Sequence, residues 1–146
     1  MPRLAAALVA CTLLALTSGC GEKSEPDFSG PGAQPPAADP LAAIAGDWSG
    51  TLRQQGVKPF TVRVTIASAD KPAANPVSYS GIDCSGTWDF QGRSGSGYSF
   101  REVIDRGKGA KCKGAGQVAV TPQGGRLAYR FHGGGVSSRG LLSKSG

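Results

Sequence analysis

Cysteine and histidine are the side chains of this sequence that could act as a nucleophile, a redox pair or a set of metal ligands. The chain has four cysteines, Cys11, Cys20, Cys84 and Cys112, and a single histidine, His132. No two cysteines have the Cys-x-x-Cys spacing that is usual in redox-active pairs. One histidine with two cysteines does not complete a structural zinc site. No serine has the Gly-x-Ser-x-Gly context of a nucleophile, and no pair of carboxylates is indicated. The sequence therefore predicts no catalytic residue, no metal site and no cofactor.

Cys20 is the cysteine with the clearest chemistry of its own. Arg3 precedes an apolar run, residues 4–16, and the small residues Ser18 and Gly19 come directly before Cys20. The run is shorter than the about 20 apolar residues that span a bilayer, and its arrangement is typical of an export signal. We expect residues 1–19 to be a signal peptide and Cys20 to receive a diacylglyceryl group and palmitate. Two acyl chains would anchor the protein to the membrane, where one chain holds only marginally.

Two alternatives to lipidation at Cys20 remain open. Cys11 follows Leu8-Val9-Ala10, which is locally a better match to a lipidation motif, although its apolar stretch is short. The other alternative is a secretory signal without lipid, in which the cysteine is incidental.

Residues 20–45 are expected to form the lipidated start of a disordered tether. The segment contains five prolines with Gly, Ser and Ala between them, and more acidic than basic residues. Such a composition cannot bury enough surface to offset the entropy of ordering, and Pro-rich chain favours extended conformations. The tether would hold residues 46–146 away from the membrane.

Residues 46–146 carry the second cysteine pair, Cys84 and Cys112. In an oxidising compartment outside the cytoplasm, an even pair in a small domain favours a disulfide. The bond would close a loop of roughly 29 residues and stabilise the fold by about 3–4 kcal/mol in the chain-entropy model.

Glu102 is the one acidic residue whose pattern predicts an inward side chain. It shares the parity of Tyr98, Phe100 and Ile104 on its segment. Buried carboxyl groups are rare unless they are paired. The candidate partners are an inward arginine, the hydroxyl of Tyr79 or Tyr129, and backbone amides. Three roles for Glu102 remain open. It is a structural hydrogen-bond anchor, or a β-bulge turns its side chain outward, or it is a polar group at the floor of a ligand cavity.

A basic cluster surrounds Cys112. From residue 46 onward, 14 Lys and Arg stand against 6 Asp and Glu, a net charge of +8. Part of this excess gathers in one Gly-rich loop as Arg106, Lys108, Lys111 and Lys113. These residues are candidates for binding an anionic envelope polymer or another envelope protein. A solvated loop that only aids solubility is the alternative, and nucleic acid is not expected as a partner outside the cell.

The elements that must position these residues are short strands. Gly and Pro interrupt alternating apolar segments about every 8–12 residues, which is the pattern of an all-β domain. We expect strands over residues 47–54, 59–67, 77–82, 86–91, 98–104, 117–121, 126–132 and 136–143. Short loops between neighbours favour an eight-stranded, antiparallel, up-and-down meander closed into a small barrel, because closure removes exposed edges. A two-sheet β-sandwich is the alternative. His132 has outward parity and should face solvent.

Several phrases of residues 46–146 resemble a family. They include Gly46-Asp47-Trp48-Ser49-Gly50, Cys84-Ser85-Gly86-Thr87-Trp88 and Phe100-Arg101-Glu102-Val103-Ile104. The segment is similar to the small exported domain of actinobacterial lipoproteins and to the extracytoplasmic C-terminal domain of some serine/threonine kinases. The resemblance implies location and architecture, and it implies no activity.

Two further resemblances imply other functions. Gly46-x-Trp48 resembles the Gly-x-Trp opening of the calycins, which include lipocalins and avidins, and implies an internal cavity for a small ligand. The lipid anchor, small barrel and disulfide resemble membrane-bound lysozyme inhibitors, although no inhibitory loop matches. The main expectation is a membrane-anchored, extracytoplasmic binding or interaction module of the cell envelope, which is not an enzyme.

Overall fold

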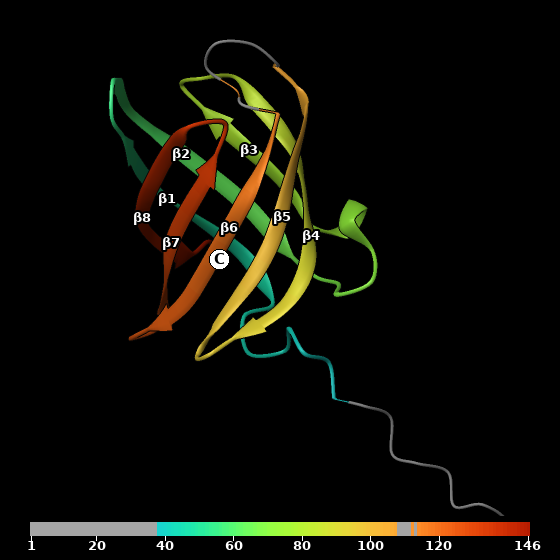
Figure 1. The fold of residues 1–146 in the computed structure, drawn as a ribbon. Helices are drawn as coiled ribbons and strands as arrows, with labels where there is room; N and C mark the ends of the chain where they lie inside the picture. Colours follow the sequence, from blue (N-terminus) through green and yellow to red (C-terminus); the bar gives the residue numbers. More distant parts are fainter. Residues whose placement is uncertain (1–37, 108–111, 113) are drawn as a thin grey trace, which may run out of the picture. The chain divides into compact units, whose positions relative to one another are not determined.

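The computed structural model describes residues 38–107, 112 and 114–146, which form a closed antiparallel β-barrel (Figure 1). Eight strands follow one another around the barrel in sequence order, and the last strand pairs with the first. The strands are β1 Gly46–Gln54, β2 Val57–Ile66, β3 Pro76–Ser80, β4 Cys84–Ser94, β5 Gly97–Arg106, β6 Ala115–Gln123, β7 Arg126–Gly133 and β8 Val136–Lys144. Each predicted strand is confirmed with shifted ends, and closure confirms the barrel over the two-sheet sandwich.

Alternation along the strands directs apolar side chains to one interior. On β2, Phe60, Val62 and Val64 are buried, whereas Arg63 is exposed. Successive side chains of a strand point to opposite faces, so each strand contributes every second residue to the core. The other strands follow this pattern, with large side chains such as Trp88, Phe100 and Tyr129 fully buried.

Glycine pairs set the register of the last two hairpins. Gly124 and Gly125 lie between the paired residues Gln123 and Arg126, and both have positive φ, +55° and +77°. Two consecutive residues of positive φ form the type I′ turn, whose twist matches that of the strands. The same Gly-Gly geometry joins β7 to β8.

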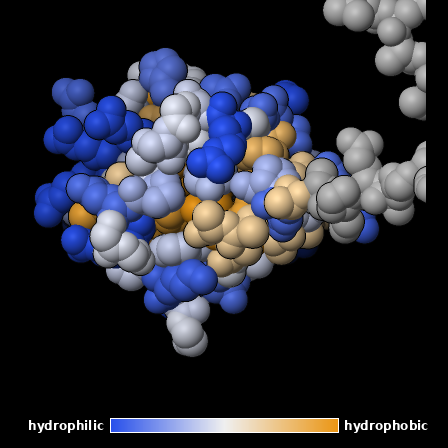
Figure 2. Space-filling view, turned by 90° about the horizontal axis from the view of Figure 1, so that it is seen from below, coloured by the Kyte–Doolittle hydropathy of each residue, from blue (hydrophilic) through white to orange (hydrophobic). Residues whose placement is uncertain are grey.

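The segment before β1 covers one end of the barrel. Leu41 and Ile44, in the turn that precedes β1, are fully buried. The Trp48 indole Nε1 donates a hydrogen bond to the Ile44 carbonyl at 2.8 Å. Figure 2 shows the molecule from below, with hydrophobic surface near the middle of the view and hydrophilic surface around much of it. The packed unit therefore begins before Gly46, and the last residues of the range predicted as tether belong to the barrel.

A buried asparagine organises the connection between β2 and β3. After the short 3-10 turn η1, Pro72–Ala74, Asn75 is fully buried. Its Oδ1 accepts hydrogen bonds from the amides of Ala67 and Ser68, and its Nδ2 donates to the carbonyls of Ser68 and Trp88. One side chain thus satisfies backbone groups that the connection would otherwise leave unpaired. Within the described residues, no helix has the length and apolar character needed to cross a membrane.

Candidate functional site

Glu102 points into the barrel, as its parity predicts, and only 4% of its surface is exposed. It lies on β5 directly opposite Trp88 of β4. The Tyr79 hydroxyl donates to Glu102 Oε2, and Trp88 Nε1 donates to the same oxygen at 2.9 Å. The Tyr79 and Tyr129 hydroxyl oxygens are 3.3 Å apart. Glu102 is thus held by side chains from β3 and β4, next to Tyr129 of β7.

Burial favours the uncharged forms of Glu102, Tyr79 and Tyr129. Burial raises the pKa of Glu102, while the hydrogen bonds from Tyr79 and Trp88 oppose the rise. Burial also raises the pKa of Tyr79 and of Tyr129, and the neighbouring Glu102 adds to both shifts. Ionised groups lose their hydration when buried, so the protonated forms are favoured. The arrangement is a hydrogen-bonded anchor between strands.

A small hollow lies beside the anchor. Its volume is about 30 Å³, and its lining includes Glu102, Tyr79, Tyr129 and Ser138. That volume accommodates one or two waters, whereas pockets for small ligands usually measure roughly 300–1,000 Å³. Aromatic side chains fill the remaining interior: the Trp88 ring lies 5.3 Å from that of Phe100 and 5.9 Å from that of Tyr129, between centroids.

The predicted disulfide is present between Cys84 and Cys112. The two Cα atoms are 6.1 Å apart, and both residues are buried. Cys84 begins β4, and Cys112 lies between β5 and β6. The bond therefore ties the connection that follows β5 to the start of the neighbouring strand.

Only part of the predicted basic cluster can be placed. Arg106 is exposed at the end of β5. Lys108, Lys111 and Lys113 lie outside the described residues, and so do Cys11 and Cys20. The binding role of the loop and lipidation at Cys20 remain predictions.

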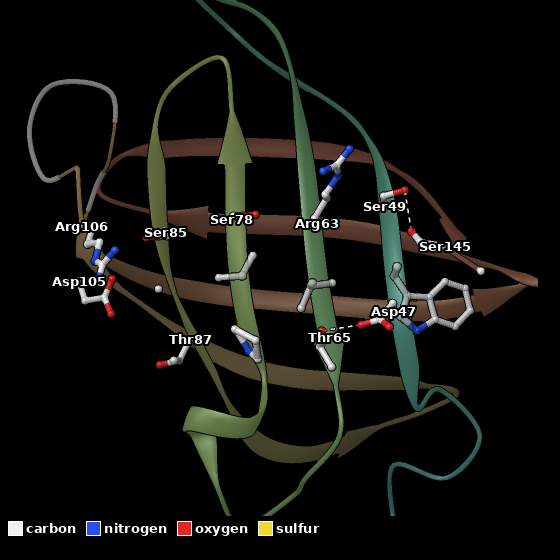
Figure 3. Close-up of a pocket in the computed structure, with 16 residues that line it drawn as sticks. Asp47, Ser49, Arg63, Thr65, Ser78, Ser85, Thr87, Asp105, Arg106 and Ser145 are labelled. Carbon is white, nitrogen blue, oxygen red and sulfur yellow. Dashed lines mark hydrogen bonds between the residues drawn. The ribbon is translucent and has the colours of Figure 1, made fainter.

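The outer face of β1–β4 carries a shallow polar depression of about 820 Å³ (Figure 3). Ser49, Arg63, Ser78 and Ser85 form a row in register across these four strands. Figure 3 shows Asp105 and Arg106 at one side of this face and Asp47 near the other. Asp47 Oδ1 accepts a hydrogen bond from Thr65 Oγ1 at 2.5 Å. This face mixes hydroxyls with charges of both signs.

A second outer depression, of about 810 Å³, extends over β5–β8 and reaches β1. Its lining includes Arg53, Arg130 and Arg139, together with His132 and Ser137. His132 is exposed, as predicted, and its Nδ1 lies 3.0 Å from Ser137 Oγ. The residues described as lining this depression include no Asp or Glu. This face is basic.

Sequence reasoning missed the arginines of this second face. Each has outward parity on its strand, which is a readable signal. The arginines align only because β7 pairs with β8 and β8 pairs with β1 in a particular register, and the sequence does not specify that register. It also missed Trp88 as a partner of Glu102, because a tryptophan in an apolar pattern is expected to supply only packing.

Two findings concern metal binding and similarity to known proteins. In the part of the chain that the structure describes, no group of three or more His, Cys, Asp or Glu is placed to hold a metal ion. Comparison of the chain with protein-family models, curated proteins and solved structures finds no match. The resemblances to exported actinobacterial domains, calycins and lysozyme inhibitors therefore remain predictions.

Proposed function

We propose that this chain is a membrane-anchored extracytoplasmic lipoprotein whose barrel is a non-catalytic binding module of the cell envelope. The observation that carries the proposal is the filled barrel interior, which leaves a hollow of about 30 Å³. A partner must then bind on the outside, where two depressions of about 820 and 810 Å³ lie on the sheet. The small volume of the interior hollow favours an outer binding face over the calycin-like carrier, because the ligand of such a carrier needs roughly ten times that interior space.

Two independent features support the extracytoplasmic location. The Cys84–Cys112 disulfide is of the kind that persists in oxidising compartments. The run that ends at Cys20 has the features of an export signal followed by a lipid attachment site. The barrel then acts as the part of the protein that meets envelope partners, and the anchor keeps it at the membrane.

Lipidation is tested by Cys20→Ala, with Cys11→Ala as the matched control. In cells fed labelled palmitate, Cys20→Ala should lose the label and leave the membrane fraction, because no acyl chain remains to hold it. Cys11→Ala should keep both. If Cys11→Ala loses the label instead, the anchor is at Cys11; if neither change matters, the lipoprotein proposal is wrong.

Binding is tested by retention of the protein on isolated cell envelopes from which membrane lipid has been removed. The basic barrel should be retained at low salt and released as salt rises, because salt screens attraction between exposed charges. The expected partner is an anionic polymer, to which Arg106 and the predicted loop lysines contribute. Absence of retention, or retention indifferent to salt, would contradict this part of the proposal.

A further inference from the structure

Three arginines stand in one row across three neighbouring strands. Arg130 of β7 is paired with Arg139 of β8, and Arg139 is paired with Arg53 of β1. Adjacent strands lie about 4.8 Å apart, so the row spans roughly 10 Å at the backbone. All three residues are exposed and line the depression of about 810 Å³. We call these residues the arginine row; β7, β8 and β1 are neighbours in Figure 1.

The row places like charges directly opposite one another. Like charges in register across strands repel and destabilise a sheet, and their spacing here is well inside a Debye length of about 8 Å. The described lining residues offer no carboxylate to offset the repulsion. The row therefore presents a concentrated positive charge that an anion lying across the strands would neutralise.

Hydrogen-bonding side chains lie beside the row on one side and at the β5 end of its line. Ala119 and then Ser99 continue it across β6 and β5. A parallel row holds Gln117, His132 and Ser137 in register. The face thus combines guanidinium groups with hydroxyl, amide and imidazole groups, which suits an extended anion with many acceptor oxygens.

We propose that the arginine row binds a linear, non-nucleic polymer whose repeats are joined by phosphodiester groups, with the chain lying across β7, β8 and β1. Arginine presents a planar fork of donors that matches phosphate and carboxylate oxygens. The oxygens of a phosphodiester are arranged tetrahedrally, so donors from two neighbouring arginines can approach the same phosphate from different directions. A carboxylate keeps its acceptor oxygens in one plane, which suits a single fork.

Single-stranded nucleic acid fits this face poorly. Proteins that bind it without sequence preference stack bases on exposed aromatic rings. The only ring of Phe, Tyr or Trp among the described lining residues belongs to Phe131, which is buried. A polymer without bases needs no such platform.

The inference rests on the proposed function for its choice of the outer surface as the binding face, and it adds a site and a ligand chemistry. The probe is a synthetic oligo(glycerol phosphate), titrated against the detergent-solubilised full chain and followed by calorimetry. The test variant combines Arg53→Gln, Arg130→Gln and Arg139→Gln. The control variant combines Lys58→Gln, Lys71→Gln and Arg126→Gln, which removes the same charge from exposed sites outside the row and outside both depressions.

The row variant should bind the oligomer at least about tenfold more weakly than the wild type, since it lacks three charge-assisted contacts. Its affinity should also depend less on salt, with a slope lower by about 2 on logarithmic axes. The control variant should lose less than about threefold. In the wild type, the oligomer should protect Arg53, Arg130 and Arg139 from modification by phenylglyoxal, which tests the site without any substitution.

Several results would overturn the inference. If both variants lose affinity for the oligomer equally, binding depends on net charge and not on the row. If the oligomer does not protect the three arginines from phenylglyoxal, the row is not the binding site. Equal or tighter binding of polyglutamate, of an oligonucleotide or of phosphatidylglycerol vesicles would assign the face to a different partner. If the wild type does not bind the oligomer but is retained salt-sensitively on envelopes, the ligand assignment is wrong and the proposed function stands. If the wild type is not retained on envelopes at all, the proposed function is contradicted instead.

Discussion

At Glu102 one carboxyl group joins three strands. Its Oε2 accepts hydrogen bonds from Tyr79 and Trp88, and it lies beside Tyr129. Parity along β5 predicts the inward direction, and the two tyrosines were among the predicted partners. The choice among anchor, bulge and cavity floor needed tertiary structure, because the volume left beside the carboxyl depends on side chains from six other strands. The structure favours the anchor.

Glu102→Gln should change how stability depends on pH. Burial raises the pKa of the folded carboxyl above its ordinary value of 4.5, so the folded state binds the proton more tightly than the unfolded state. The resulting stabilisation is present below about pH 4.5 and is lost as pH rises through the folded pKa. The free energy of unfolding of the wild type should therefore fall relative to that of Glu102→Gln between pH 4.5 and neutral pH.

Urea unfolding of both proteins across this pH range measures the difference. Tyr79→Phe is the control, because it keeps the carboxyl and removes one hydrogen bond to it. It should be less stable than the wild type and keep the pH dependence. Parallel curves for the wild type and Glu102→Gln would show that the carboxyl titrates alike in the folded and unfolded states, contrary to this prediction.

At the scale of elements, the turn before β1 is the main difference from the predicted organisation. The composition of residues 20–45 indicates tether throughout, yet Leu41 and Ile44 are fully buried at the barrel end. Two apolar residues in a Pro- and Ala-rich stretch carry little periodic signal. Their burial follows from the indole of Trp48, which donates to the Ile44 carbonyl and holds the turn against the barrel.

Leu41→Ala should therefore destabilise the barrel by about 2–5 kcal/mol, the range for a leucine truncated in a packed site. Ala42→Ser, in the same turn but exposed, is the control and should change stability by less than about 0.5 kcal/mol. Chemical unfolding followed by tryptophan fluorescence measures both changes, and Trp48 lies beside the altered site. A loss below about 1 kcal/mol would mean that the turn is not part of the cooperative unit.

At the scale of the whole molecule, closure of the barrel and the disulfide define the folded unit. β8 pairs with β1, so none of the eight described strands leaves an edge for another chain to join. Aromatic side chains fill the barrel interior, so the proposed binding lies on the outer faces. On those faces, register brings Arg53, Arg130 and Arg139 together although they are far apart in the chain.

Replacing both domain cysteines, as Cys84→Ala with Cys112→Ala, should lower the free energy of unfolding by about 3–4 kcal/mol. The bond spans a sequence separation of 28 residues, and its loss frees that loop in the unfolded state. Urea unfolding of the oxidised wild type, the reduced wild type and the double variant provides the measurement. The last two should agree within about 1 kcal/mol; a double variant as stable as the oxidised protein would remove the bond as a source of stability.

The sequence by itself predicted the all-β fold class, the strands and the cysteine pairing, and its parity favoured an inward carboxyl at Glu102. These follow from local alternation, from turn residues and from the small number of cysteines, all of which act over short stretches or allow few combinations. The tertiary structure alone decided that the interior is filled, that Trp88 holds Glu102, that residues before Gly46 cover the barrel end and that three arginines align. Each of these depends on register and packing between strands distant in the chain, and side-chain volumes and cross-strand contacts are set only when the barrel closes.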